Sequence, residues 1–157
     1  MGPPAVKKLD EVMRGIPRLG VDTAPWIYLV ERHPDHVAVM REIIRRAEAD
    51  DGNFDLVTSV LTLTEVLTLP LREQQQETAA AYSSILLNSP HLQVVPVDME
   101  VAEGGARLRA AYEGLKTPDA IQLAVAIQSG CGAFLTNDHR IPAVREIPVI
   151  QLSDLTL

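Results

Sequence analysis

The chain has 157 residues, the length of one typical domain. A chain of this length buries roughly 70% of the surface that its unfolded form exposes, so it can hold a core without disulfides. Hydrophobic residues make up 46% and charged residues 22%, which excludes a disordered tail and a low-complexity array. The net charge is −7, from 21 acidic and 14 basic residues, which excludes a protein that coats nucleic acid through positive charge.

The single cysteine, Cys131, excludes an intrachain disulfide and a cysteine zinc site. The sequence therefore predicts a reducing, cytoplasmic compartment. Charged residues interrupt the first 20 positions, so no signal peptide is expected. No apolar stretch reaches the ~18–20 residues of a membrane span. We expect one domain over residues 1–157, in which residues 1–17 form an N-terminal extension with a helix.

Short apolar runs alternate with helical periodicities along the chain, which is typical of parallel βαβ units. The first predicted elements are a helix over 6–16, a strand over 18–21, a helix with Thr23 as its N-cap, a helix over 36–49 and a strand over 54–60. The later ones are helices over 61–69 and 73–87, a strand over 92–97, helices over 99–112 and 120–128, and strands over 133–136 and 149–152. The segment 61–69 alternates like a strand, but α/β architectures place a helix after a strand, so a helix is predicted there.

Four acidic residues lie at informative places in this pattern. Asp22 and Asp138 follow apolar strands, Asp119 lies in the first turn of a helix, and Glu65 is a charge embedded in an apolar run. Ligands bind at the carboxyl ends of the strands in an open parallel sheet, so we expect these acids to converge there. Clustered carboxylates repel one another, and a divalent cation such as Mg²⁺ or Mn²⁺ turns that repulsion into coordination. Such a metal promotes phosphodiester hydrolysis.

Each acid also has a purely structural interpretation. Asp119 can complement the helix dipole, Asp22 and Asp138 can be ordinary turn residues, and Glu65 can pair with an arginine. Only the joint placement of the four at one edge of the sheet favours a metal site.

Four segments in order resemble the motifs of the PIN-domain ribonucleases, in particular the VapC-like toxins of bacterial toxin–antitoxin pairs. They are GVDT at 20–23, SVLTLTEVL at 59–67, TPDAIQLA at 117–124 and FLTND at 134–138. Each segment is short, but their order and spacing together are fairly specific. The resemblance extends over residues 18–152, which is nearly the whole chain.

The resemblance implies a three-layer α/β/α sandwich with a mostly parallel sheet in strand order 3-2-1-4-5. It also implies an endoribonuclease that depends on Mg²⁺ or Mn²⁺ and leaves a 5′-phosphate and a 3′-hydroxyl. By carry-over, Asp22 and Asp119 would be the principal metal ligands, and Glu65 and Asp138 would complete the acidic site. Thr136 would hydrogen-bond a metal-bound water or the substrate.

The same resemblance implies an RNA substrate, a homodimer and a small antitoxin whose C-terminal segment lies across the active site. The net charge of −7 fits a partner that brings an arginine or a lysine into the acidic cluster. Lys116 and Arg140 flank the third and fourth motifs, together with Arg145, and are candidates for phosphate contacts. Aromatic residues make up only 4% of the chain, which predicts no base-stacking platform.

Two other functions stay open at this point. The first is a non-catalytic PIN-like module that binds RNA or a protein. The second is a phosphotransfer domain with an aspartate as phosphoacceptor, which requires a lysine at a strand end near the acids. Lys116 lies just before a helix instead, so the sequence favours the ribonuclease.

Overall fold

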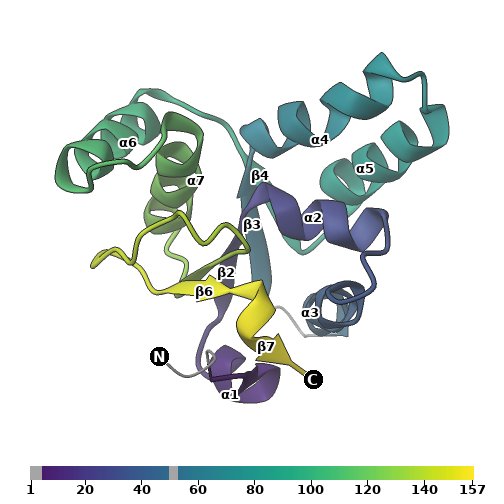
Figure 1. Ribbon diagram of the computed structural model, residues 1–157, viewed down its shortest axis with the longest axis horizontal. Helices are drawn as coiled ribbons and strands as arrows, with labels where there is room; N and C mark the ends of the chain where they lie inside the picture. Colours follow the sequence, from purple (N-terminus) through teal and green to yellow (C-terminus); the bar gives the residue numbers. More distant parts are fainter. Residues whose placement is uncertain (1–4, 50–52) are drawn as a thin grey trace.

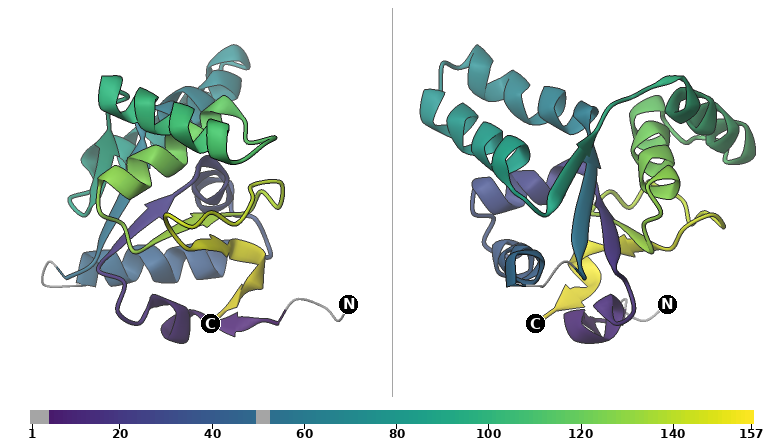
Figure 2. Two further views of the ribbon diagram at one scale, coloured as in Figure 1. Left: turned by 90° about the vertical axis from the view of Figure 1, so that its left-hand side faces the viewer. Right: turned by 180° about the vertical axis from the view of Figure 1, so that it is seen from behind.

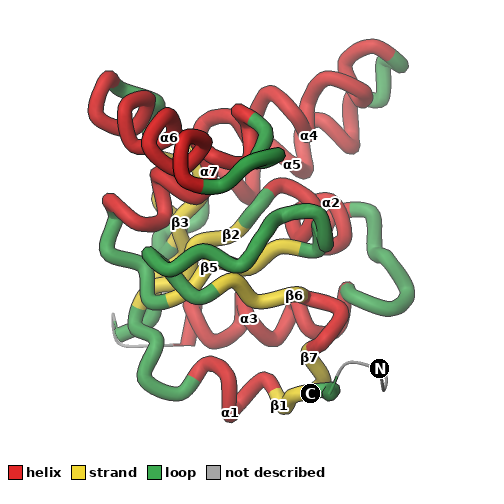
Figure 3. Tube along the Cα trace, turned by 60° about the vertical axis from the view of Figure 1, so that its left-hand side comes forward, coloured by secondary structure: helices red, strands yellow, loops and turns green. Residues whose placement is uncertain are grey.

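The computed structural model describes residues 5–49 and 53–157. Its central sheet has five strands in the spatial order β4-β3-β2-β5-β6, and every neighbouring pair is parallel (Figure 1). The strands are β2 Arg18–Val21, β3 Asp55–Ser59, β4 Leu92–Val95, β5 Ala133–Thr136 and β6 Val149–Gln151. Figure 3 shows β2, β5 and β6 as neighbours. Counted in chain order from β2, the strand order is 3-2-1-4-5, so the expected architecture is confirmed.

Helices cover both faces of this sheet (Figures 1 and 2). On one side lie α2 Thr23–Val30, α3 Val37–Ala49, α4 Val60–Arg72 and α5 Gln76–Asn88. On the other side lie α6 Met99–Ala111 and α7 Thr117–Gln128. Among the described helices, none has the length and apolarity that a bilayer crossing requires.

The strands alternate their side chains between two separate cores, as a period of two residues requires. Leu19 and Val21 of β2 and Leu135 of β5 pack with the core on the side of α2 and α3. Phe134 packs with the other core, beneath α6 and α7. Both faces of the sheet are therefore apolar, as expected for a parallel sheet covered on both sides.

Gly20 of β2 lies directly against α7. A Cβ atom at this position would lie 2.6 Å from the Cβ of Ala126 in α7 and 3.3 Å from the ring of Phe134. Only glycine leaves room for this contact, and the contact holds the helix against the strand. Ala126 lies near the C-terminal end of α7, so this contact fixes that end of the helix against β2.

The predicted helix over 6–16 is wrong in its extent. The chain first forms β1 Lys7–Lys8, which pairs with β7 Leu155–Thr156, and then a short helix, α1 Leu9–Met13. Pairing with the C-terminal strand draws the first residues into an extended conformation. Gly15, with φ of +77°, turns the chain after the helix.

The predicted helix over 73–87 is wrong at its start. Glu73 instead caps the preceding helix α4, and its N–H donates to the Leu69 carbonyl at 3.0 Å. The chain then turns at Gln74, which has φ of +57°, and α5 begins at Gln76. Pro70 lies inside α4, so the proline in this segment does not end the helix.

Candidate functional site

The carboxyl ends of β2 and β5 place two of the predicted acids at one edge of the sheet. Val21 pairs with Leu135 in the parallel register, and the Asp22 N–H donates to the Leu135 carbonyl at 2.8 Å. Asp138 lies two residues beyond the end of β5, and its N–H donates to Thr136 Oγ1 at 3.0 Å. The backbone of the two neighbouring strands therefore brings Asp22 and Asp138 together.

Asp22 is a buried carboxylate that accepts two short hydrogen bonds. The backbone N–H of Thr23 donates to Oδ1 at 2.8 Å, and the Thr136 hydroxyl donates to Oδ2 at 2.7 Å. Burial raises the pKa of the Asp22 carboxyl above its usual value, and the charge of Asp138 adds to the rise. The bonds from Thr136 and Thr23 oppose it.

Asp22 is also the N-cap of α2, so the prediction that Thr23 caps this helix is wrong. Thr23 is the first helical residue, and its hydroxyl points to neighbouring side chains. It donates to Glu65 Oε1 at 3.2 Å and lies 3.3 Å from the Thr62 hydroxyl. An aspartate before a helix is as good an N-cap as a threonine, so the local sequence did not decide between them.

A buried polar network lies behind these residues. Gln122 Nε2 donates to Thr62 Oγ1 at 2.9 Å and to Thr23 Oγ1 at 3.3 Å. The Thr58 hydroxyl donates to the Val21 carbonyl at 2.8 Å and lies 2.7 Å from that of Thr62. Polar atoms this deeply buried need such partners. Sequence analysis missed Thr58, Thr62 and Gln122, whose only signal was a polar residue at positions where the pattern requires apolar ones.

Glu65 and Asp119 lie on opposite sides of Asp22, on α4 and α7. Burial raises the pKa of the Glu65 carboxyl, and the charges of Asp22 and Asp119 raise it further, whereas the Thr23 hydrogen bond lowers it. Burial likewise raises the pKa of Asp119, followed by the charges of Asp22 and Asp138. Electrostatic interaction thus links all four predicted acids.

The expectation that Glu65 is embedded among apolar side chains is wrong. The residue as a whole is exposed, although its carboxylate is partly enclosed where it accepts the bond from Thr23. Its apolar sequence neighbour Val66 turns into the core instead. A helix distributes consecutive residues around its axis, so an apolar stretch in the sequence does not surround a residue in space.

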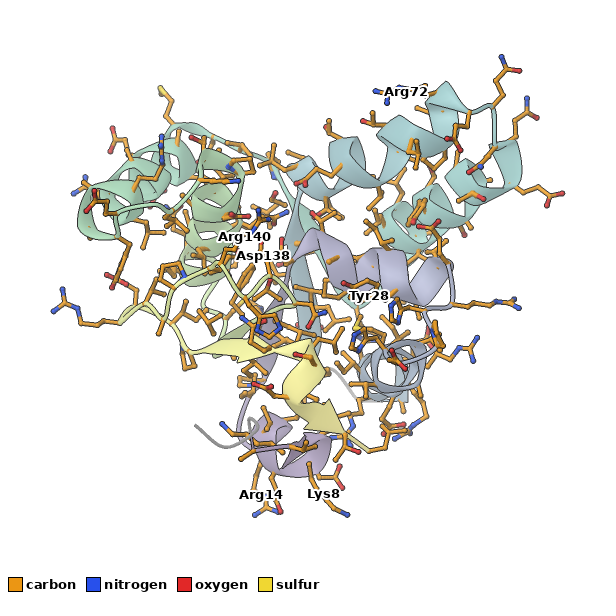
Figure 4. The ribbon with its side chains drawn as sticks, viewed as in Figure 1. Lys8, Arg14, Tyr28, Arg72, Asp138 and Arg140 are labelled. Atoms are coloured by element: carbon orange, nitrogen blue, oxygen red, sulfur yellow. The ribbon has the colours of Figure 1, made fainter. Side chains whose placement is uncertain are left out.

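Asp138 differs from the other three acids because a cation holds it. Arg140 makes a two-pronged ion pair with it, Nε to Oδ1 at 2.9 Å and Nη2 to Oδ2 at 2.8 Å. This pairing lowers the pKa of Asp138. Lys116, the N-cap residue of α7, adds a second positive charge that acts on Asp119 and Asp138. Figure 4 labels Asp138 and Arg140 at this edge of the sheet.

The carboxylates present suit a divalent metal ion in their chemistry and charge. All four donors are carboxylate oxygens, the ligand type that Mg²⁺ and Mn²⁺ prefer. Three of them have raised pKa values, which shows that the folded protein disfavours their charges unless a cation compensates them. Across residues 5–49 and 53–157, however, no three acidic, histidine or cysteine side chains come close enough to form an assembled metal cage.

The chain belongs to the PIN domain family, whose family model matches residues 20–147. This range contains all four acids and both of the neighbouring cations. No curated protein sequence matches the chain significantly.

Solved structures with the same fold come from bacterial toxin–antitoxin systems. VapBC2 from Rickettsia felis, bound to a DNA fragment of its promoter, has a TM-score of 0.63 at 15% identity, covering 85% of this chain and 98% of that one. A toxin–antitoxin complex from Klebsiella pneumoniae has a TM-score of 0.58 at 25% identity, covering 86% and 97%. VapC20 of Mycobacterium tuberculosis, a sarcin-ricin loop cleaving toxin, has a TM-score of 0.58 at 21% identity, covering 74% and 86%.

Proposed function

We propose that this protein is a Mg²⁺- or Mn²⁺-dependent endoribonuclease and the toxin of a toxin–antitoxin pair. The observation that carries the proposal is the electrostatic interaction that links four carboxylates, from four separate segments of the chain, near the carboxyl edge of one parallel sheet. Membership of the PIN domain family and the likeness to VapC toxins support the same activity.

In this proposal Asp22 and Asp119 are the main ligands of the metal, and Glu65 and Asp138 complete the site. When bound, the metal would polarise a phosphoryl oxygen and make a water molecule more acidic. Asp22 is held by two hydrogen bonds, so its oxygens are fixed in direction before any ligand arrives. The Thr136 hydroxyl is one of those two donors, and it also accepts a bond from the Asp138 N–H, so it orients both Asp22 and the loop that carries Asp138.

Lys116 and Arg140 would bind the phosphate backbone of the RNA. Both lie beside the carboxylates and both interact electrostatically with Asp119. A phosphate that approaches the site would compete with Asp138 for the guanidinium group of Arg140, and a fork of N–H donors suits phosphate as well as carboxylate. Without such cations, a protein with a net charge of −7 would repel its own substrate.

The partners of this toxin follow from the same observations. The acidic site would attract an antitoxin segment that carries arginine or lysine, because burial and the negative charges of neighbouring acids raise the pKa values of Asp22, Glu65 and Asp119. The structures of VapBC complexes from other bacteria support a protein partner of this kind. We also propose a homodimer and a cytoplasmic location.

The test is RNA cleavage by the purified chain with Mg²⁺ or Mn²⁺ and, separately, with a chelator. Asp119→Asn keeps the shape of the side chain and removes one ligand charge, so we expect cleavage to fall at least about 100-fold while the fold is retained. Glu103→Gln is the matched control, since it removes an exposed carboxylate that pairs with Arg107 on the surface of α6. Equal cleavage by Asp119→Asn and Glu103→Gln would refute the proposed role of the acidic site.

The non-catalytic alternative has one observation in its favour. Asp138 is already neutralised by Arg140, so one of the four candidate ligands is occupied within the chain. If the protein is a binding module, RNA or a protein will bind without any cleavage in Mn²⁺. Mass analysis of the RNA after incubation distinguishes the two functions directly.

A further inference from the structure

Three rings gather at the corner between α2 and α3. Tyr28 lies in α2, His33 in the connecting turn and His36 directly before α3. The ring of Tyr28 is 4.7 Å from that of His33 and 4.9 Å from that of His36, measured between centroids, and the two imidazoles stack at 4.7 Å with an interplanar angle of 21°. All three residues are only partly buried, so together they form a small surface of flat rings, here called the ring cluster.

The ring cluster adjoins the acidic site. The side-chain amide of Asn137 donates to the Tyr28 hydroxyl oxygen at 3.3 Å, and Asn137 directly precedes Asp138. The other end of that amide accepts a bond from the Ser153 N–H at 3.0 Å, which fixes its orientation. Figure 4 labels Tyr28 on α2 and Asp138 on the loop after β5. The Asn137 side chain therefore links the ring cluster to the segment that carries Asp138.

The chemistry of the ring cluster is that of a surface on which bases stack. Tyrosine and histidine rings stack on unpaired bases in single-strand and RNA-loop recognition. Arg32, which is exposed, precedes His33 at the same corner and supplies a cation for a neighbouring phosphate. We propose that the ring cluster of Tyr28, His33 and His36 binds an unpaired nucleobase of the RNA whose backbone lies at the acidic site. This inference rests on the proposed ribonuclease function.

The proposal implies a preference for single-stranded RNA. A base inside a duplex is paired and stacked on its neighbours, and turning it out costs a few kcal/mol. An unpaired base pays no such cost when it stacks on the cluster. The prediction that the chain has no base-stacking platform came from its aromatic content of 4%, a percentage that does not count histidine. The experiment below tests that prediction as well.

The rings also have a possible structural role, which makes a different prediction. The turn is closed by a bond from the His33 N–H to the Tyr28 carbonyl at 2.9 Å and by one from the Asp35 N–H to His33 Nδ1 at 3.2 Å. Neither bond uses the phenol ring of Tyr28 or the imidazole of His36. If the rings only stabilise the corner, removing them lowers the melting temperature and leaves the RNA affinity of the folded protein unchanged.

The experiment measures RNA binding in an Asp119→Asn background, where the RNA is not cleaved. The probes are a short fluorescein-labelled single-stranded RNA, the same RNA annealed to its complement, and a single strand that carries 2-aminopurine. Fluorescence polarisation gives the affinity, and 2-aminopurine quenching reports stacking on a ring. The variants are Tyr28→Leu, Tyr28→Phe and the double variant His33→Leu/His36→Leu. Tyr112→Leu is the control, because the Tyr112 hydroxyl bonds Glu146 in the loop beside α6.

We expect Tyr28→Leu and the double histidine variant to bind single-stranded RNA about 5- to 50-fold more weakly and to lose the quenching. Binding of the duplex should change little. Tyr28→Phe keeps the ring and should restore most of the lost affinity, and Tyr112→Leu should match the unchanged protein. Thermal melts show whether each variant is folded. If Tyr28→Leu does not fold, the double variant His33→Leu/His36→Leu provides the test.

The inference is overturned if the natural chain cleaves RNA with Mn²⁺ and yet both ring variants keep its affinity, its quenching and its preference for single strands. The ribonuclease function then stands without the ring cluster. If the natural chain neither cleaves nor binds RNA, the proposed function fails and this inference fails with it.

Discussion

Thr136→Val tests how the site holds its buried carboxylate. The Thr136 hydroxyl donates to Asp22 Oδ2 at 2.7 Å and accepts from the Asp138 N–H at 3.0 Å. Thr136 is completely buried, so water cannot replace either bond. A hydrogen bond to a charged group contributes about 1.5–3 kcal/mol, and a buried N–H left without a partner costs about 1–3 kcal/mol. Valine has nearly the same shape and leaves no cavity, so the two contributions together predict a loss of about 2.5–6 kcal/mol of folding free energy.

The pH dependence of this loss identifies Asp22 as its cause. Burial raises the pKa of Asp22, so at low pH a larger share of this carboxyl is protonated than of an ordinary aspartate, and a protonated carboxyl accepts a weaker bond from Thr136. As the pH rises toward 8 the ionised share of Asp22 grows, so we expect the bond to be stronger and its loss to cost more at pH 8 than at pH 4. Urea unfolding in a chelator at the two pH values measures both costs. Thr136→Ser keeps the hydroxyl and loses one buried methyl group, so its free energy of unfolding should fall by about 1 kcal/mol at either pH.

A Thr136→Val variant as stable as Thr136→Ser at pH 8 would contradict the reasoning. A cost that is equal at pH 4 and pH 8 would also do so, since it would show that the charge of Asp22 is not involved. Cleavage of RNA by the same variants adds a second measurement. We expect Thr136→Val to be the less active, because Asp22 loses one of the two bonds that orient it.

Three further predictions concern charge and packing. The acids with raised pKa values stabilise the metal-free fold at low pH, and this contribution to stability is lost as the pH rises. The melting temperature of Asp119→Asn, relative to that of the unchanged protein, should therefore be higher at pH 8 than at pH 4. Added Mn²⁺ should reverse this difference, because it stabilises the unchanged protein more. Arg140→Gln frees Asp138 and removes a positive charge, so calorimetry should show Mn²⁺ binding a few-fold tighter; weaker binding would mean that Arg140 supports the site. Gly20→Ala places a Cβ 2.6 Å from a methyl carbon of α7 and should cost about 1–3 kcal/mol in urea unfolding, whereas Gly132→Ala, with its nearest contact at 3.4 Å, should cost far less.

The alternation of apolar runs and helical periodicities was sufficient to predict most of the fold. The strands at 18–21 and 133–136 occur with the predicted bounds, because a short apolar run between turn residues has few other conformations available. The boundaries near 6–16 and 73–87 were wrong. At the first, pairing of β1 with β7 joins residues almost 150 positions apart, and no local pattern encodes such a contact.

The sequence by itself predicted four candidate acids near one edge of the sheet, because residues that follow parallel strands meet at the carboxyl edge. Only the tertiary structure decided what surrounds each of them. The order of strands places Thr136 against Asp22, the turn after β5 places Arg140 on Asp138, and the corner between α2 and α3 brings the rings of Tyr28, His33 and His36 together. The atoms within a few ångströms of a carboxyl group determine its pKa and whether it is free to bind a cation. Most of those atoms belong to residues that are remote in sequence.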